Sequence, residues 1–355
     1  MTGAVLSRAG FRQRTRLATP ALLVAANLPD IEVFGSPFGF NYLESHRGIT
    51  HSLVGSALLA TGLAGCLYLV DRLSRRGAVS RSSFRALWVV CLAGIFSHVA
   101  LDFLNDYGIR PWLPFSGAWV YGDLLSIVDP WLWIILGSAL YVGTRSPAGR
   151  LGWLVLGCMM FAAVCLGRNL SAGIAWLVIL AALLAAGLAL RRRGYNPAVA
   201  ALLLLALYLG GVVVMRENVA RVVRSRATAL VSGSPVKIDV LPGRPNQDRS
   251  WTVVAEAPGK YYISEVRLRD WRLELPGFEA FEKNLDDLCY LASLSQEQMA
   301  VMARFARYPS VAVEPSANGC RVWLRDLRYA RRNEPGWGVA HATVALTGPR
   351  PVQSR

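Results

Sequence analysis

Long apolar runs separated by short polar loops fill the first 215 residues of this chain, which has 355 residues in all. Six long runs cover residues 52–70, 86–104, 124–143, 151–167, 172–190 and 198–215, and a shorter run covers residues 17–28. A helix needs about 20 apolar residues to cross a bilayer, so the long runs predict membrane helices, whereas the short run is not long enough to cross comfortably. The pattern predicts a mainly α-helical, polytopic bundle of about six to seven membrane helices.

The pattern changes after residue 215. Alternation of apolar and polar residues, as in SWTVVAEA and KYYISEVRLRDW, predicts β-strands, and one amphipathic helix is predicted over residues 282–307. We therefore predict two domains, a membrane-embedded domain over residues 1–215 and a small β-rich soluble domain over residues 216–355. Cys289 and Cys320 are the two cysteines outside the apolar runs, and they can pair if the second domain faces an oxidising compartment.

Arginines are concentrated in alternate loops of the first domain. One set of loops contains Arg8, Arg12, Arg14, Arg16, Arg72, Arg75, Arg76, Arg81, Arg85, Arg145, Arg150, Arg191, Arg192 and Arg193, whereas the opposite loops contain Arg47, Arg110 and Arg168. The positive-inside rule predicts a cytoplasmic N-terminus and, provided that the short first run crosses, an extracytoplasmic C-terminal domain. These loops also explain the formal net charge of +15, so the expected partner is the lipid bilayer and no nucleic acid is expected.

The same orientation brings the histidines and most acidic residues of the first domain to the outer face. They are Asp30, Glu32, Glu44, His46, His51, His98, Asp102, Asp106, Asp123 and Asp129, and Asp71 is the one acidic residue before Arg216 that falls on the inner side. Residues that are spread over a hundred positions of sequence are therefore expected to meet at one face of the membrane.

Two pairs of residues stand out in this group. His98 and Asp102 are spaced i, i+4 and share one helical face, where they could bind one divalent ion or form an ordinary hydrogen-bonded pair. An apolar helix favours the functional interpretation, because ionisable groups are costly there. His46 and His51 are five residues apart, and Thr50 is a reasonable N-cap, so His51 is predicted to open the next helix while His46 lies in the loop before it.

Further candidates surround these pairs. Asp30 and Glu32 suit an extended stretch after Pro29, and either could act as a general base if it does not bind metal. Arg47 is suited to bidentate contact with a phosphate or carboxylate. Asp129 is either an N-cap or another ligand. The metal candidates are thus Asp30, His46, His51, His98, Asp102 and Asp129; histidine and carboxylate ligands favour zinc, as one or two ions.

The segments NLPDIE, HRGITHSL, SHVALDFLNDYGIRPWLPF and IVDP resemble the motifs of the YdjM-like membrane-bound metal-dependent hydrolases, a bacterial inner-membrane family related to zinc-dependent phospholipase C and P1-type nucleases. The resemblance covers roughly residues 1–130. It implies a multi-pass inner-membrane protein in which Asp30, His46, His51, His98 and Asp102 form the metal site and a phosphoester, possibly of a lipid, is hydrolysed.

The chain departs from the family pattern at two places. Glu32 stands where the family has an aspartate, and its longer side chain moves the carboxylate. The family's early histidine has no counterpart before MTGAVLSRAG, so either the natural chain starts upstream or one ligand is missing.

The leading functional hypothesis is a membrane-embedded metal-dependent hydrolase that cleaves a small-molecule or lipid phosphoester at the outer face. The alternatives are a non-enzymatic metal-binding or transport-related membrane protein and a homologue that has lost its activity. A transporter would place its ionisable groups near the bilayer midplane, so their position at helix ends favours a surface site.

Overall fold

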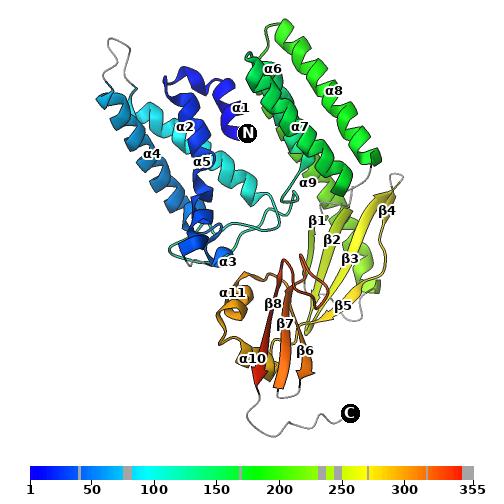
Figure 1. Cartoon of the computed structure of the whole chain (residues 1–355). Coiled ribbons are helices and arrows are strands. Elements are labelled where there is room, and N and C mark those ends of the chain that lie inside the picture. The colour runs from blue at the N-terminus through cyan, green and yellow to red at the C-terminus, as the bar shows by residue number, and fades with distance from the viewer. Residues whose placement is uncertain are drawn as a thin grey trace. The chain divides into compact units, whose positions relative to one another are not determined.

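The structure is a computed structural model that describes residues 1–38, 41–74, 82–167, 170–230, 237–243, 250–269, 272–316 and 319–345. The chain forms two compact units (Figure 1). The first contains Met1–Phe40, Ser45–Glu217 and Pro242–Ser250, and the second contains Asn41–Glu44, Asn218–Leu241 and Trp251–Arg355. Arg75, Arg76, Arg81 and Arg168 of the predicted loops lie outside the described residues.

Five helices of the described chain are long and apolar enough to cross a membrane. They are α4 (Leu53–Leu73), α5 (Phe84–Phe103), α7 (Pro147–Gly167), α8 (Leu170–Arg192) and α9 (Pro197–Leu230). A sixth apolar helix, α6 (Pro130–Gly143), has 14 residues, which corresponds to about 21 Å. The prediction of a mainly helical membrane protein with a β-rich C-terminal region is confirmed.

Helix α6 is shorter than the apolar run over residues 124–143 that predicted it. Asp129 is its N-cap and Pro130 its first residue. Proline at this position fits a helix start, because its missing N–H is one that the first turn leaves unpaired. Leu125 instead forms an isolated β-bridge with Asn105, so the apolar residues before Asp129 belong to a loop that runs back to the end of α5.

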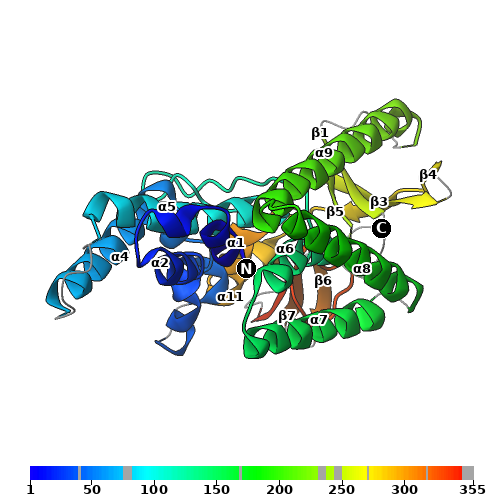
Figure 2. The ribbon, with the colours of Figure 1, turned by 90° about the horizontal axis from the view of Figure 1, so that it is seen from above.

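The short first run forms α2 (Ala18–Ala25), which packs against α1 (Thr2–Arg8) and α5. Eight residues of helix extend only about 12 Å, so α2 does not cross a bilayer by itself. Seen from above, α1 and α2 lie beside α5 (Figure 2). Their close approach depends on small residues, since a Cβ atom at Gly94 of α5 would lie 2.6 Å from the Cβ of Ala25.

Contacts between loops place the basic residues of the first unit at one end. Arg16 pairs with Asp71 near the end of α4, and Thr15 donates to Ser82 just before α5 (2.6 Å). Arg8 donates to Thr144 at the end of α6 (2.9 Å). We call this end of the unit the basic end. Since α4 begins at Leu53, just after His51, and ends beside Asp71, and α5 runs back from its N-cap Ser83, residues near His51 and Asp102 lie at the opposite end.

The second unit contains two sheets. One has the order β1 (Lys237–Pro242), β2 (Ser250–Ala257), β3 (Lys260–Arg269) and β4 (Arg272–Glu274), with β5 (Glu279–Glu282) also paired to β3. The other has the order β6 (Pro309–Ser316), β7 (Gly319–Asp326) and β8 (Val339–Ala345), with antiparallel pairing throughout. The last part of α9 packs Val219 and Val223 against the first sheet.

Two features of this unit bear on the sequence predictions. The single helix predicted over residues 282–307 is wrong, because the structure has α10 (Leu288–Ser293) and α11 (Glu297–Phe305). Helix α10 begins only at Leu288 because Asp287 is its N-cap and accepts from the N–H groups of Cys289 (2.8 Å) and Tyr290 (3.2 Å). The predicted pairing of Cys289 with Cys320 is confirmed, and this disulfide links α10 to β7.

Candidate metal centre

The end of α5 supplies two adjacent ligands. His98 and Asp102 are one turn apart, and His98 Nε2 lies 3.3 Å from Asp102 Oδ2. The other ring nitrogen, His98 Nδ1, lies 2.9 Å from the carbonyl oxygen of Ala26. This carbonyl can only accept a hydrogen bond, so it assigns an N–H to Nδ1 and directs Nε2 at Asp102. The packing of α2 on α5 thereby orients the histidine.

His51 reaches the same point from the turn before α4. It belongs to a short 3₁₀ turn, η3 (Ile49–His51), and its side chain is fully buried. His51 Nε2 lies 3.1 Å from Asp102 Oδ2, and the ring centroids of His51 and His98 are 5.4 Å apart. The two histidines therefore face each other across Asp102.

The predicted N-cap of α4 is wrong by two residues. Ser52 is the N-cap, and its hydroxyl accepts from the N–H of Gly55 (2.9 Å). Thr50 does not cap the helix because its hydroxyl donates to Glu32 instead. His51 consequently lies in the turn before the helix.

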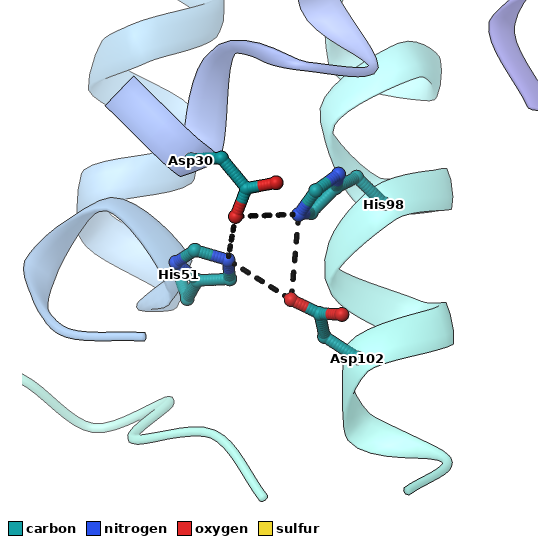
Figure 3. Close-up of side chains that lie close together, drawn as sticks. All are labelled: Asp30, His51, His98 and Asp102. Carbon is teal, nitrogen blue, oxygen red and sulfur yellow. Dashed lines mark ion pairs between the residues drawn. The ribbon is translucent and has the colours of Figure 1, made fainter. Parts of the chain in front are cut away.

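Asp30 completes a group of four. It lies in η2 (Leu28–Phe38), and its Oδ1 is 3.4 Å from His98 Nε2 and 3.7 Å from His51 Nε2. One ligand atom from each of Asp30, His51, His98 and Asp102 lies within 4.8 Å of all the others (Figure 3). Tetrahedral zinc with bonds of about 2.0–2.1 Å has ligand atoms about 3.3–3.4 Å apart, close to these separations.

The two imidazole nitrogens at the centre support a metal site. His51 Nε2 and His98 Nε2 are buried, and neither forms a hydrogen bond with a described residue, although carboxylate oxygens lie within 3.7 Å. Such groups are costly to bury unless something binds them. Burial lowers the pKa of His51, but the carboxylates of Asp102 and Glu32 outweigh this effect and raise it. A metal ion would therefore have to displace a proton here.

Arg47 is a buried residue that contacts the ligand Asp102. It is 5% exposed, and its guanidinium donates to Asp102 Oδ1 (3.0 Å) and to Asn105 Oδ1 (2.7 Å). It also donates to the backbone carbonyl oxygen of Asp102 (3.1 Å) and lies over the ring of Tyr107 at 4.6 Å. Arg47 thus holds one carboxylate oxygen of Asp102 and leaves the other, Oδ2, for the two histidines.

Glu32 holds the loop that carries His51. Its carboxylate accepts from the backbone N–H groups of Arg47 and Gly48 and from the hydroxyl of Thr50. It also lies 3.2 Å from His51 Nδ1, on the side of the ring opposite Asp102. Glu32 is therefore placed next to the four-residue group without contributing a ligand atom to it.

Two other candidates lie outside the four-residue group. His46 lies 3.6 Å from Glu32, and burial, followed by the nearby Arg47 charge, lowers its pKa to about 4. At neutral pH it is uncharged, so this contact is not an ion pair. Asp129 caps α6 by accepting from the N–H of Leu132 (2.8 Å), and its other oxygen accepts from Tyr208 (2.7 Å). Of the two interpretations of Asp129, the structure shows the N-cap.

Some contacts of the site could not be read from the sequence. The Ala26 carbonyl belongs to an apolar stretch with no distinguishing side chain. Asn105 follows Asp102 by three residues, which places it near the same helix face. This spacing was the one feature of the sequence that pointed to Asn105.

The four-residue group lies in the part of the chain that is similar to a known protein family. Residues 1–171, which include all four residues of the group, match the family described as YdjM inner membrane protein. The chain is 30% identical over 130 residues to the uncharacterized protein YfhP of Bacillus subtilis (strain 168), which is 36% of this chain and 37% of YfhP. The chain thus spans little more than a third of this relative. No solved structure matches. Residues 1–171 of this multi-pass membrane protein are therefore similar to the YdjM inner membrane protein family.

Proposed function

We propose that this protein is a membrane-embedded, metal-dependent hydrolase of phosphoesters. The observation that carries the proposal is the convergence of four ligand atoms, from Asp30, His51, His98 and Asp102, within 4.8 Å of one another. Two imidazoles, which are neutral once a metal has displaced their protons, and two carboxylates suit zinc, whereas calcium and magnesium prefer oxygen ligands alone. Bound there, zinc would lower the pKa of a water molecule and polarise a phosphoryl oxygen.

Asp30 marks the side from which a substrate would approach. Its side chain is 46% exposed, whereas those of His51, His98 and Asp102 are between 0% and 18% exposed. Asp30 is therefore the ligand that water and substrate can reach, and we assign it a dual role, as ligand and as the carboxylate nearest to an attacking water. Glu32 and Arg47 act in this proposal by positioning His51 and Asp102.

Arg110 is the better candidate for the cationic contact that a phosphoester needs. It lies beside the His51 loop, where a Cβ atom at Gly48 would be 3.3 Å from Arg110 Nη2. Its guanidinium lies over the ring of Trp119 at 4.9 Å. The Arg47 guanidinium donates to Asp102, Asn105 and Gly108, so it is directed at a ligand and its helix end.

One observation favours a second candidate function. Four protein ligands fill a tetrahedral shell, which is typical of structural zinc, whereas catalytic zinc keeps a position for water. On this alternative the protein is a non-enzymatic metal-binding membrane protein. The two candidates differ in whether the exposed Asp30 leaves its position when substrate binds.

We further propose that the site lies at the extracytoplasmic face of the inner membrane and that the second unit is extracytoplasmic as well. The arginines at the basic end support this orientation through the positive-inside rule, and the Cys289–Cys320 disulfide fits an oxidising compartment. A reporter that is active only outside the cytoplasm, fused after Arg355, should be active. An inactive reporter together with labelling of the tail from the cytoplasmic side would reverse the orientation.

Metal analysis of the purified full chain tests the proposed site. The wild-type protein should contain close to one zinc ion per chain or more, and His51→Ala and His98→Ala should lose it. His341→Ala is the matched control, because His341 lies in β8 against Trp323, at a centroid distance of 4.9 Å. Equal metal content in all four proteins would refute the site.

Hydrolysis of a soluble phosphodiester and of short-chain phospholipids then separates the two functions. Zinc-dependent turnover that His98→Ala abolishes would establish the hydrolase. Stoichiometric zinc with no turnover of any phosphoester would favour the non-enzymatic alternative.

A further inference from the structure

A second candidate site lies at the basic end of the first unit, away from the metal centre. Here a cavity of about 690 Å³ lies between the segment after α1, the end of α6, the end of α8 and the start of α9. Four arginines line it, Arg8, Arg12, Arg145 and Arg191, and no acidic residue of the described part of the chain is in the lining. The arginines come from three separate segments, with Arg8 and Arg12 in the first, so their convergence is a property of the tertiary structure and not of one basic run.

Neighbouring groups hold two of these arginines in place. Arg8 donates to Thr144 Oγ1 (2.9 Å), and Arg191 donates to the carbonyl oxygen of Val142. Asn196 in turn donates to the carbonyl oxygen of Arg8 (2.7 Å). Arg12 and Arg145 are exposed, and they can therefore move towards a ligand. The cavity thus has a fixed pair of cations and an adaptable pair.

The charge of this cavity lacks a counter-ion among its lining residues. Asp71, an acidic residue of the same end, is already bound by Arg16 and by the N–H of Ser82 (2.8 Å). Burial, and then the charge of Arg12, lower the pKa of Arg8, although a guanidinium remains protonated in proteins. A bound anion would relieve this repulsion, and the N-terminus of α9, which begins at Pro197 beside the cavity, favours negative charge as well.

Apolar surface adjoins the cations. Leu188, one turn before Arg191 on α8, is 45% exposed, and Val199, just after the cavity on α9, is 39% exposed. Both belong to helices that are long and apolar enough to cross a membrane. A ligand that contacts the arginines and this surface together must carry a negative headgroup and hydrocarbon chains.

We propose that this cavity binds the phosphate of an anionic phospholipid. Guanidinium groups bind phosphate oxygens through paired, charge-assisted hydrogen bonds, and basic pockets between membrane helices are a recognised mode of lipid-headgroup binding. The site is separate from the metal centre, and neither the metal nor hydrolysis is needed for it.

Native mass spectrometry of the purified full chain tests the proposal, with phosphatidylglycerol and phosphatidylcholine added in equal amounts. The wild-type protein should retain phosphatidylglycerol in preference to phosphatidylcholine. The double variant Arg12→Gln/Arg145→Gln should reduce this preference roughly 30-fold, because each arginine contributes about 1 kcal/mol to the binding of an anionic lipid and about 1.4 kcal/mol corresponds to a factor of ten. Arg72→Gln/Arg85→Gln is the matched control, since it removes the same charge from the basic end but outside the cavity.

Three results would overturn the proposal. They are equal retention of the two lipids by the wild type, an equal loss of preference in both double variants, and displacement of phosphatidylglycerol by inorganic phosphate at millimolar concentration. The last result would identify the ligand as a soluble phosphate. An unchanged melting temperature in both double variants serves as the measure of correct folding.

Discussion

Arg47 and Asp102 form the contact that orients the metal cluster. Arg47 Nη2 donates to Asp102 Oδ1 at 3.0 Å, while Asp102 Oδ2 lies 3.1 Å from His51 Nε2 and 3.3 Å from His98 Nε2. One carboxylate thus connects a buried cation in the loop after α3 to both histidines. Because the two oxygens have different partners, Asp102 can offer a single oxygen to a metal in a fixed direction.

Replacing Arg47 with lysine should therefore weaken metal binding. Lysine cannot reproduce the fork that reaches Asp102 and Asn105 together, and loss of such a supporting contact typically weakens metal affinity about 10- to 100-fold. The zinc Kd, measured by competition with a chelating dye, should rise by that factor in Arg47→Lys. Arg110→Lys should leave the zinc Kd unchanged and raise KM. The opposite pattern would make Arg47 the substrate contact.

Glu32→Gln distinguishes a positioning role from a general base. The amide keeps the size of the side chain but has one acceptor oxygen in place of two, so it cannot accept from both Thr50 and the backbone of Arg47, and the negative charge beside His51 is lost. We expect roughly tenfold weaker zinc binding and a matching fall in activity. Glu44→Gln, an exposed carboxylate on α3 (Tyr42–Ser45), is the control. Normal zinc affinity with a kcat that falls more than about 100-fold would instead identify Glu32 as the base.

Gly94→Ala should disturb the metal centre through the packing of α2 on α5. The added Cβ atom would lie 2.6 Å from the Cβ of Ala25 and 3.3 Å from the N atom of Ala26, so α2 must shift and the Ala26 carbonyl moves away from His98. Overpacking of this kind costs about 1–3 kcal/mol, and zinc content should fall with the melting temperature. In Gly62→Ala on α4, the added Cβ atom meets no other atom within 4 Å. That control should keep its zinc and gain slightly in stability.

Asp129→Ala should lower stability without affecting zinc content. The variant loses the cap of α6 and the contact to Tyr208, which together stabilise the fold by about 1–2 kcal/mol. Thermal unfolding of Asp129→Ala, Tyr208→Phe and the double variant should show that the two changes are not additive. Loss of zinc from Asp129→Ala would restore this residue as a ligand.

Removal of the metal should lower the melting temperature of the wild-type protein. An ion that binds the folded state and is present at about 100 times its Kd stabilises by roughly 2.7 kcal/mol, and a chelator removes this contribution. The melting temperature of His98→Ala should not respond to the chelator. An equal response in both proteins would mean that the chelated ion binds elsewhere.

Local spacing was sufficient for part of this protein. The length of the apolar runs fixed most of the membrane helices, and the four-residue spacing of His98 and Asp102 fixed their common face, because helical periodicity depends only on neighbouring residues. The alternating segments after residue 215 likewise predicted the strands. Asp129 and Pro130 indicated the true start of α6, although the hydrophobic run begins before them.

Tertiary structure decided which candidates share the site. His46 and His51 were both metal candidates in the sequence, but Glu32 accepts from the backbone of Arg47 and Gly48 and from Thr50, and this arrangement brings His51, and not His46, into the four-residue group. Tertiary structure also decided that Glu32 and Arg47 hold the ligands in position, because their hydrogen-bond partners come from distant segments. The conformation of a loop follows from such long-range hydrogen bonds, and these are not encoded in the spacing of residues along the chain.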